Sequence, residues 1–97
     1  MRDPFVVIIR FSGDPHDLDK RFEQVRSRWL EAQPTSYEPP LFYATGKTDE
    51  GIAVVTAWAT ASAHRAFGQA LHGLIDEAGM PHPESVERLR VLKLGWD

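Results

Sequence analysis

The 97-residue sequence predicts an α+β fold with elements in the order β-α-β-β-α-β, and two kinds of local pattern support this prediction. Residues 5–11 and 51–58 are short runs of β-branched, aromatic and other apolar residues, which are typical of strands. Residues 14–32 and 60–79 place apolar residues three or four positions apart, as amphipathic helices do. Two further runs, at 41–45 and 86–94, supply the other two strands.

The strand at residues 51–58, GIAVVTAW, is apolar on both faces, because side chains of a strand alternate between its two sides. Such a strand is typical of the middle of a sheet that is covered on both sides. Residues 5–11 share this feature and are interrupted only by Arg10, so we expect both strands to be central. The charges within 86–94 favour an edge position for the last strand.

Both helices carry start or stop signals. Asp14, followed by Pro15, is a favourable start for the first helix, which we expect to end near Ala32. Thr60 or Ser62 can cap the second helix. Gly79 ends it, because glycine accepts the left-handed conformation there. The expected apolar stripes are Leu18, Phe22, Val25 and Trp29 in the first helix, with Arg26 at the edge, and Ala63, Phe67, Ala70, Leu71, Leu74 and Ala78 in the second.

The sequence also indicates the connections between these helices and strands. Three prolines predict that residues 33–40 form a loop, and residues 46–51 read as a hairpin turn. The apolar alternation of the last strand breaks near Val91 and Leu92, which predicts a bulge or a change of strand partner there. We expect a single domain over residues 1–97, because this length suffices for one core.

The simplest arrangement of these elements is ferredoxin-like, a four-stranded antiparallel sheet with two helices on one face. Two helices cover only one face, yet residues 5–11 and 51–58 are apolar on both. The open face therefore needs a partner, and a second copy of the chain is the most economical one. The sequence predicts a homodimer that pairs through its sheets.

Composition narrows the class of protein. The net charge of −3 argues against a nucleic-acid partner, because phosphate binding needs a basic surface. The absence of cysteine removes disulfides, thiolate catalysis and cysteine-based metal sites, and it fits a reducing compartment. The apolar run at the start is too short for a transmembrane helix and lacks a signal-peptide pattern. We expect a cytoplasmic protein without a membrane partner.

The run LFYATGKTDEGIAVVTAWATASAHRAF, residues 41–67, resembles the second hairpin and following helix of the dimeric α+β barrel superfamily. That group includes antibiotic-biosynthesis monooxygenases and haem-degrading monooxygenases, and the likeness is to its small actinobacterial-type members of unknown function. The resemblance implies pairing through the sheets and a small molecule bound between sheet and helices. It implies no particular reaction, because enzymes and binding modules share this architecture.

Departures from those relatives bear on cofactors. Haem-degrading members carry a ligating His along the second helix, where this chain has Glu77, and the chain contains no Asn for the quinone-forming chemistry of cofactor-free members. The histidines form no metal-binding pattern. We therefore expect neither a cofactor nor a metal.

The candidate catalytic residues are His64 and Tyr43, as groups for proton transfer, each with a plainer alternative as a first-turn surface histidine or a core tyrosine. The candidate substrate-binding residues are Trp58, Arg10, Arg26 and Phe67. Arg10 either holds an anionic substrate or forms a salt bridge across the dimer, and Trp58 is either a pocket wall or core.

Two classes of function remain open at this point. One is a monooxygenase-like or isomerase-like enzyme that acts on an aromatic or polyketide-like compound, with Arg10 holding an enolate or phenolate. The other is a ligand-binding or purely structural dimer without chemistry. The two classes differ in whether Tyr43, Trp58, His64 and Arg10 converge on one cavity.

Overall fold

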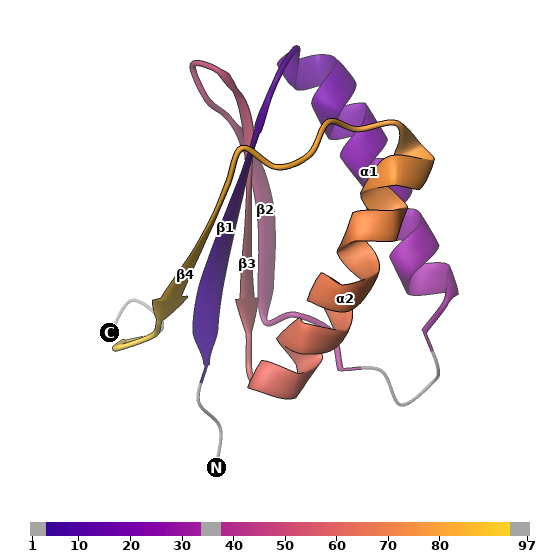
Figure 1. The fold of residues 1–97 in the computed structure, drawn as a ribbon. Coiled ribbons are helices and arrows are strands. Elements are labelled where there is room, and N and C mark those ends of the chain that lie inside the picture. Colours follow the sequence, from indigo (N-terminus) through magenta and orange to yellow (C-terminus); the bar gives the residue numbers. More distant parts are fainter. Residues whose placement is uncertain (1–3, 34–37, 94–97) are drawn as a thin grey trace.

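The computed structural model describes residues 4–33 and 38–93, and it confirms the predicted order and the ferredoxin-like fold. The strands lie in the order β2-β3-β1-β4 with every pairing antiparallel, so β1 and β3 are central and β4 is an edge, as predicted. Both helices cover the same face of the sheet (Figure 1). The elements are β1 (Phe5–Ser12), α1 (Pro15–Glu31), β2 (Phe42–Lys47), β3 (Gly51–Trp58), α2 (Ala61–Ala78) and β4 (Ser85–Arg90).

The predicted helix ends are present as hydrogen-bonded caps. The Asp14 carboxylate accepts the backbone N–H of Asp17 at 2.9 Å, and the Thr60 hydroxyl accepts that of Ala63 at 3.2 Å. Gly79 ends α2 with a φ of 72°, the left-handed conformation expected there. Neither helix of the described ranges is long and apolar enough to cross a membrane.

Several strand ends differ from the prediction by one residue, and two differ by more. β2 runs on to Lys47, because the hairpin closes later than expected, with the N–H of Thr48 bonded to the carbonyl of Gly51 at 2.9 Å. β4 ends at Arg90, so neither the bulge nor the change of strand partner predicted near Val91 and Leu92 is present within the described residues. The N–H of Val91 instead bonds the Pro4 carbonyl. Leu94, the predicted end of this strand, and residues 34–37 of the predicted loop lie outside the described residues.

The core lies between the sheet and the helices. The predicted stripe of α1 is buried throughout. In α2 the buried residues are Phe67, Leu71 and Ile75, so the stripe is rotated from the predicted one, in which Leu74 and Ala78 stood in place of Ile75. Phe67, Leu71 and Ile75 are four residues apart, so they lie on one side of α2, and this side faces the sheet. Leu74 and Ala78 lie at the edge of this side, toward α1.

The second face of the sheet is uncovered by any described element and is largely apolar. Val7, Ile9 and Phe11 point toward the helices, so their neighbours along β1 point away. The pairing registers extend this pattern across the sheet. We call the resulting surface the open face; its apolar members with exposed area are Val6, Ile8, Phe42, Ala44, Ala53, Val55 and Leu89, whereas Ala57 on the same side is only 2% exposed.

Gly51 offers a test of this packing. A Cβ on Gly51 would lie 2.1 Å from the carbonyl oxygen of Phe11, a backbone atom of the paired strand that has no room to move away. Gly51→Ala is therefore expected to lower the free energy of unfolding by about 2–4 kcal/mol through backbone overpacking.

The matched control is Gly73→Ala, in the interior of α2, where an added Cβ meets no atom within 4 Å. It should raise the free energy of unfolding by about 0.5–1 kcal/mol, because alanine favours the helix over glycine. Urea denaturation followed by circular dichroism measures both variants. Equal stabilities for Gly51→Ala and the unmodified chain would contradict the β1–β3 packing described here.

Candidate functional site

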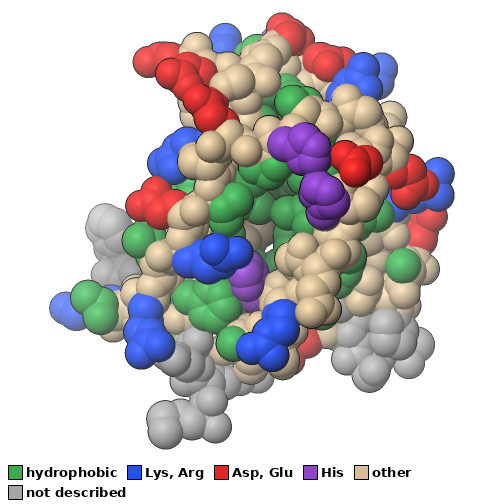
Figure 2. All heavy atoms as spheres, in the orientation of Figure 1, with side chains coloured by type: hydrophobic (Ala, Val, Ile, Leu, Met, Phe, Trp, Pro, Cys, Tyr) green, Lys and Arg blue, Asp and Glu red, His purple; other side chains and the backbone are tan. Residues whose placement is uncertain are grey.

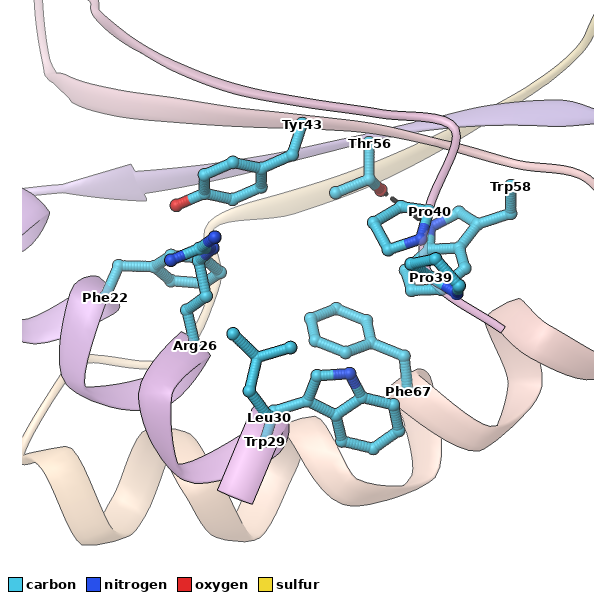
Figure 3. A pocket seen from close by; sticks show the side chains of 10 residues that line it. All are labelled: Phe22, Arg26, Trp29, Leu30, Pro39, Pro40, Tyr43, Thr56, Trp58 and Phe67. Atoms are coloured by element: carbon cyan, nitrogen blue, oxygen red, sulfur yellow. Dashed lines mark hydrogen bonds between the residues drawn. The ribbon is translucent and has the colours of Figure 1, made fainter. Parts of the chain in front are cut away.

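A cavity of about 250 Å³ lies between the sheet and the two helices (Figure 3). We call it the aromatic cavity, because half of its lining residues have aromatic side chains. The helices contribute three of these rings and the strands two. The aromatic members are Phe22, Trp29, Tyr43, Trp58 and Phe67. The other lining residues are Arg26, Leu30, Pro39, Pro40 and Thr56.

The inner wall of this cavity is fixed by ring packing. The centroid of the Phe67 ring lies 5.2 Å from that of Trp29 and 5.3 Å from that of Trp58, both within the range of favourable aromatic contact. The Trp58 indole Nε1–H donates to the hydroxyl of Thr56 at 2.8 Å, which satisfies two buried polar groups and holds the indole in one orientation. Trp58, 1% exposed, is thus both core and pocket wall.

The polar end of the cavity is built by Tyr43 on β2 and Arg26 on α1 (Figure 3). The Arg26 guanidinium carbon lies 5.3 Å from the centroid of the Tyr43 ring, a cation–π contact, and its Nη1 lies 3.6 Å from a Glu23 carboxylate oxygen. Burial, then the charge of Glu23, raises the pKa of Tyr43 to about 12. The phenol therefore stays protonated near neutral pH and serves as a hydrogen-bond donor, with Glu23 as its present acceptor at 3.4 Å.

A second cavity, of about 160 Å³, lies between α2 and β4, and we call it the His64 cavity. The His64 ring meets the Phe5 ring edge to face, at 5.0 Å between centroids, and the Trp58 ring at 6.1 Å. Burial, then the positive charge of Arg88, lowers the pKa of His64. The side chains of Phe67 and Thr56 line both cavities and so stand between them.

The structure divides the site residues expected from the sequence. Tyr43, Trp58, Arg26 and Phe67 line the aromatic cavity, whereas His64 lines the second cavity. Arg10 lines neither. It lies on the open face, where its Nη1 is 3.1 Å from a carboxylate oxygen of Glu87 on β4.

Two further residues were not among the expected site residues. Thr56 was interpreted only as a β-branched strand residue, and Arg88 only as an edge-strand charge. Arg88 lies opposite Val7 in the β1–β4 register, so it faces the helices together with Val86. The alternating positions of Val86, Arg88 and Arg90 indicated that these side chains share one face of the strand. Which face they share follows only from the register with β1. Among the described residues, no group of three His, Asp or Glu side chains could hold a metal ion.

The environment of His64 predicts its titration. Its pKa in the folded protein is below the usual 6.5, so folding favours the neutral imidazole. The stability that this residue contributes is present above pH 6.5 and is lost as the pH falls toward the folded pKa. NMR titration of the ring is expected to give a value below 6.5. In Arg88→Gln it should rise but stay below 6.5, because burial is the larger cause; a value at or above 6.5 in the unmodified chain would contradict this environment.

Comparisons with known proteins bear on the fold. No family model and no curated protein matches the sequence. Among solved structures, the chain is similar to a putative antibiotic biosynthesis monooxygenase from Chloroflexus aurantiacus J-10-fl, with a TM-score of 0.63 and 12% identity over 96% of this chain and 97% of that one. It is also similar to a putative antibiotic biosynthesis monooxygenase from Caulobacter crescentus CB15, with a TM-score of 0.65 and 19% identity over 95% of this chain and 92% of that one.

Identities this low establish the architecture and leave the activity open. Both similarities extend over nearly all of each chain, so they apply to the complete βαββαβ arrangement and not to one hairpin. The chain shares the ferredoxin-like βαββαβ fold of these two solved structures, as the sequence led us to expect.

Proposed function

We propose that this protein binds a small aromatic molecule in the aromatic cavity and does so as a homodimer. The observation that carries the proposal is the lining itself: of the lining residues that the structure describes, five have aromatic side chains around a space of about 250 Å³, and only Arg26 carries a charge. Ligand sites are typically concave and mostly apolar, with a few polar groups that fix orientation. The Tyr43 hydroxyl and the Arg26 guanidinium are such groups here.

The volume limits the size of the ligand. An apolar cavity of roughly 150 Å³ is enough to bind benzene. The larger aromatic cavity fits one or two fused rings. The Tyr43 phenol, protonated at neutral pH, would turn its hydroxyl from Glu23 to donate to an oxygen on such a ligand. Arg26 adds positive potential at the same end, although its ion pair with Glu23 offsets part of that charge.

The homodimer part of the proposal rests on the open face. This surface includes Phe42, 52% exposed, and Leu89, 45% exposed, on opposite edges of the sheet. The apolar residues of β1 and β3 lie between them. A continuous apolar sheet face of this kind marks an interaction surface, and a second copy presents the same surface in self-complementary form. Pairing there would leave the helix-covered side of the sheet free for the ligand.

A monooxygenase-like reaction is the second candidate, and the names of the two structurally similar proteins favour it. Among the described residues, the aromatic cavity is lined by no carboxylate or histidine, so with this lining the substrate would have to bring its own reactivity toward dioxygen. For 1-naphthol the balanced conversion uses one O₂ and gives 1,4-naphthoquinone and water. The phenol supplies all four electrons, one oxygen atom enters at C4, and the other leaves as water.

Binding is tested with 1-naphthol by isothermal titration calorimetry under nitrogen. We expect a dissociation constant on the order of 0.1 mM, as for a ligand of about 11 heavy atoms at roughly 0.5 kcal/mol per atom. Leu30→Trp should weaken binding at least tenfold, because residue 30 lines the cavity, is 43% exposed and can accept a larger side chain that fills the space.

Leu41→Trp is the matched control, since Leu41 is similarly exposed and is not part of the lining. It should bind 1-naphthol as the unmodified chain does. Equal binding by Leu30→Trp would overturn the proposed site. Under air, formation of the quinone only in the presence of the protein would support the monooxygenase-like reaction. Binding without quinone formation would indicate a binding protein.

The dimer is tested by placing a charge on the open face. Sedimentation equilibrium of the unmodified chain is expected to give twice the 11.0 kDa chain mass. Val55→Glu should give a folded monomer, because Val55 lies in the centre of the open face, opposite Ile8 and Ala44. The control Gln69→Glu adds the same charge on an exposed position of α2 and should remain dimeric. A monomeric unmodified chain would refute this part of the proposal.

A further inference from the structure

The His64 cavity differs in character from the aromatic cavity. It opens between β4 and α2, where Figure 2 shows a hollow with hydrophobic side chains on its floor and histidine and basic side chains at its mouth. Its floor is formed by side chains that are at most 9% exposed: Val7, Ile9, Phe67, Leu71 and Ile75. The polar side chains of its lining are Thr56, His64, His72 and Arg88, with no carboxylate among them.

Arg88 lies at the mouth of this cavity, on the exposed edge strand β4. Its side chain is on the helix side of the sheet, because it pairs with Val7, which points toward the helices. Arg10, on the other side of the same sheet, pairs with Glu87, and Arg26 pairs with Glu23. Among the described residues Arg88 makes no hydrogen bond or ion pair of this kind, so its five N–H donors are available to an external acceptor.

His64 supplies the second polar group. Its ring lines the same cavity and interacts electrostatically with Arg88, and no side-chain hydrogen bond engages it among the described residues. Because its pKa is lowered, the imidazole is neutral at physiological pH and offers one N–H donor and one acceptor. His72, the remaining ionisable group of the lining, lies 3.8 Å from Asp76 and is engaged at the outer rim.

We propose that the His64 cavity is a second ligand site, which binds a small organic carboxylate with Arg88 as its counter-ion and His64 as a hydrogen-bond donor. Arginine suits a carboxylate because its planar fork can bind both oxygens at once. The apolar floor accepts the remainder of the molecule, and a space of about 160 Å³ accommodates a single ring. Benzoate has this composition.

The site is independent of the proposed function, because Phe67 and Thr56 separate it from the aromatic cavity. Binding of benzoate is measured by NMR titration at pH 7.5, with the His64 ring and the amides of β4 as reporters. We expect saturation with a dissociation constant on the order of 1 mM, and at least tenfold weaker binding of the uncharged analogue benzyl alcohol. Bound benzoate should also raise the pKa of His64, because a nearby anion stabilises the imidazolium.

Two variants locate the binding. Arg88→Gln should weaken benzoate binding at least tenfold, whereas Arg65→Gln, which removes the same charge from an exposed position of α2, should leave it unchanged. Gly68→Leu fills the cavity from α2, where an added side chain meets open space, and should abolish binding; Gly73→Leu is its control.

Leu30→Trp, which blocks the aromatic cavity, should leave benzoate binding intact. The proposal is overturned if benzoate does not saturate, if Arg88→Gln binds it as well as the unmodified chain, or if Leu30→Trp removes the binding. The last result would assign benzoate to the aromatic cavity. Failure of the unmodified chain to bind 1-naphthol, with benzoate binding retained, would instead count against the proposed function alone.

Discussion

The antiparallel pairing of β1 with β3 is the constraint on which the rest of the structure depends. Both strands are central and apolar on both faces, so each must bury two sets of side chains. The helices cover one face and leave the other open. Pairs such as Val7 with Thr56 therefore build the cavity side, and pairs such as Ile8 with Val55 build the open face. One pairing thus determines both the shape of the cavities and the surface available to a partner.

On the helix side, one aromatic side chain determines how the space is divided. Phe67 packs against Trp29 and Trp58 and leaves an aromatic cavity on one side and the His64 cavity on the other. In the aromatic cavity, the Arg26 guanidinium is paired with Glu23, and the Tyr43 phenol is neutral near neutral pH. The second cavity has a cation, Arg88, without a carboxylate. The two spaces therefore suit ligands of different charge, although they share a wall.

Most of the fold followed from local patterns in the sequence. The strand at Gly51–Trp58 and both helix caps were predictable because β-branched runs, Asp14, Thr60 and Gly79 act through their immediate neighbours. The site was less predictable. Whether Arg10 or Arg88 faces the helices depends on the register between strands far apart in the sequence, and that register places Arg88, not Arg10, beside the His64 cavity.

The register is held mainly by the side chains that it buries. Thr56 and Trp58 lie two residues apart on β3, so they share one face of the strand and keep their mutual hydrogen bond in any register. A slip of one residue in β3 would move both side chains to the open face and bring Val55 and Ala57 inward in their place. Val55 matches Thr56 in size, but Ala57 is too small to replace the Trp58 indole as core and as a wall of the aromatic cavity. The burial of Trp58 therefore favours the one register in which both cavities and an apolar open face exist together.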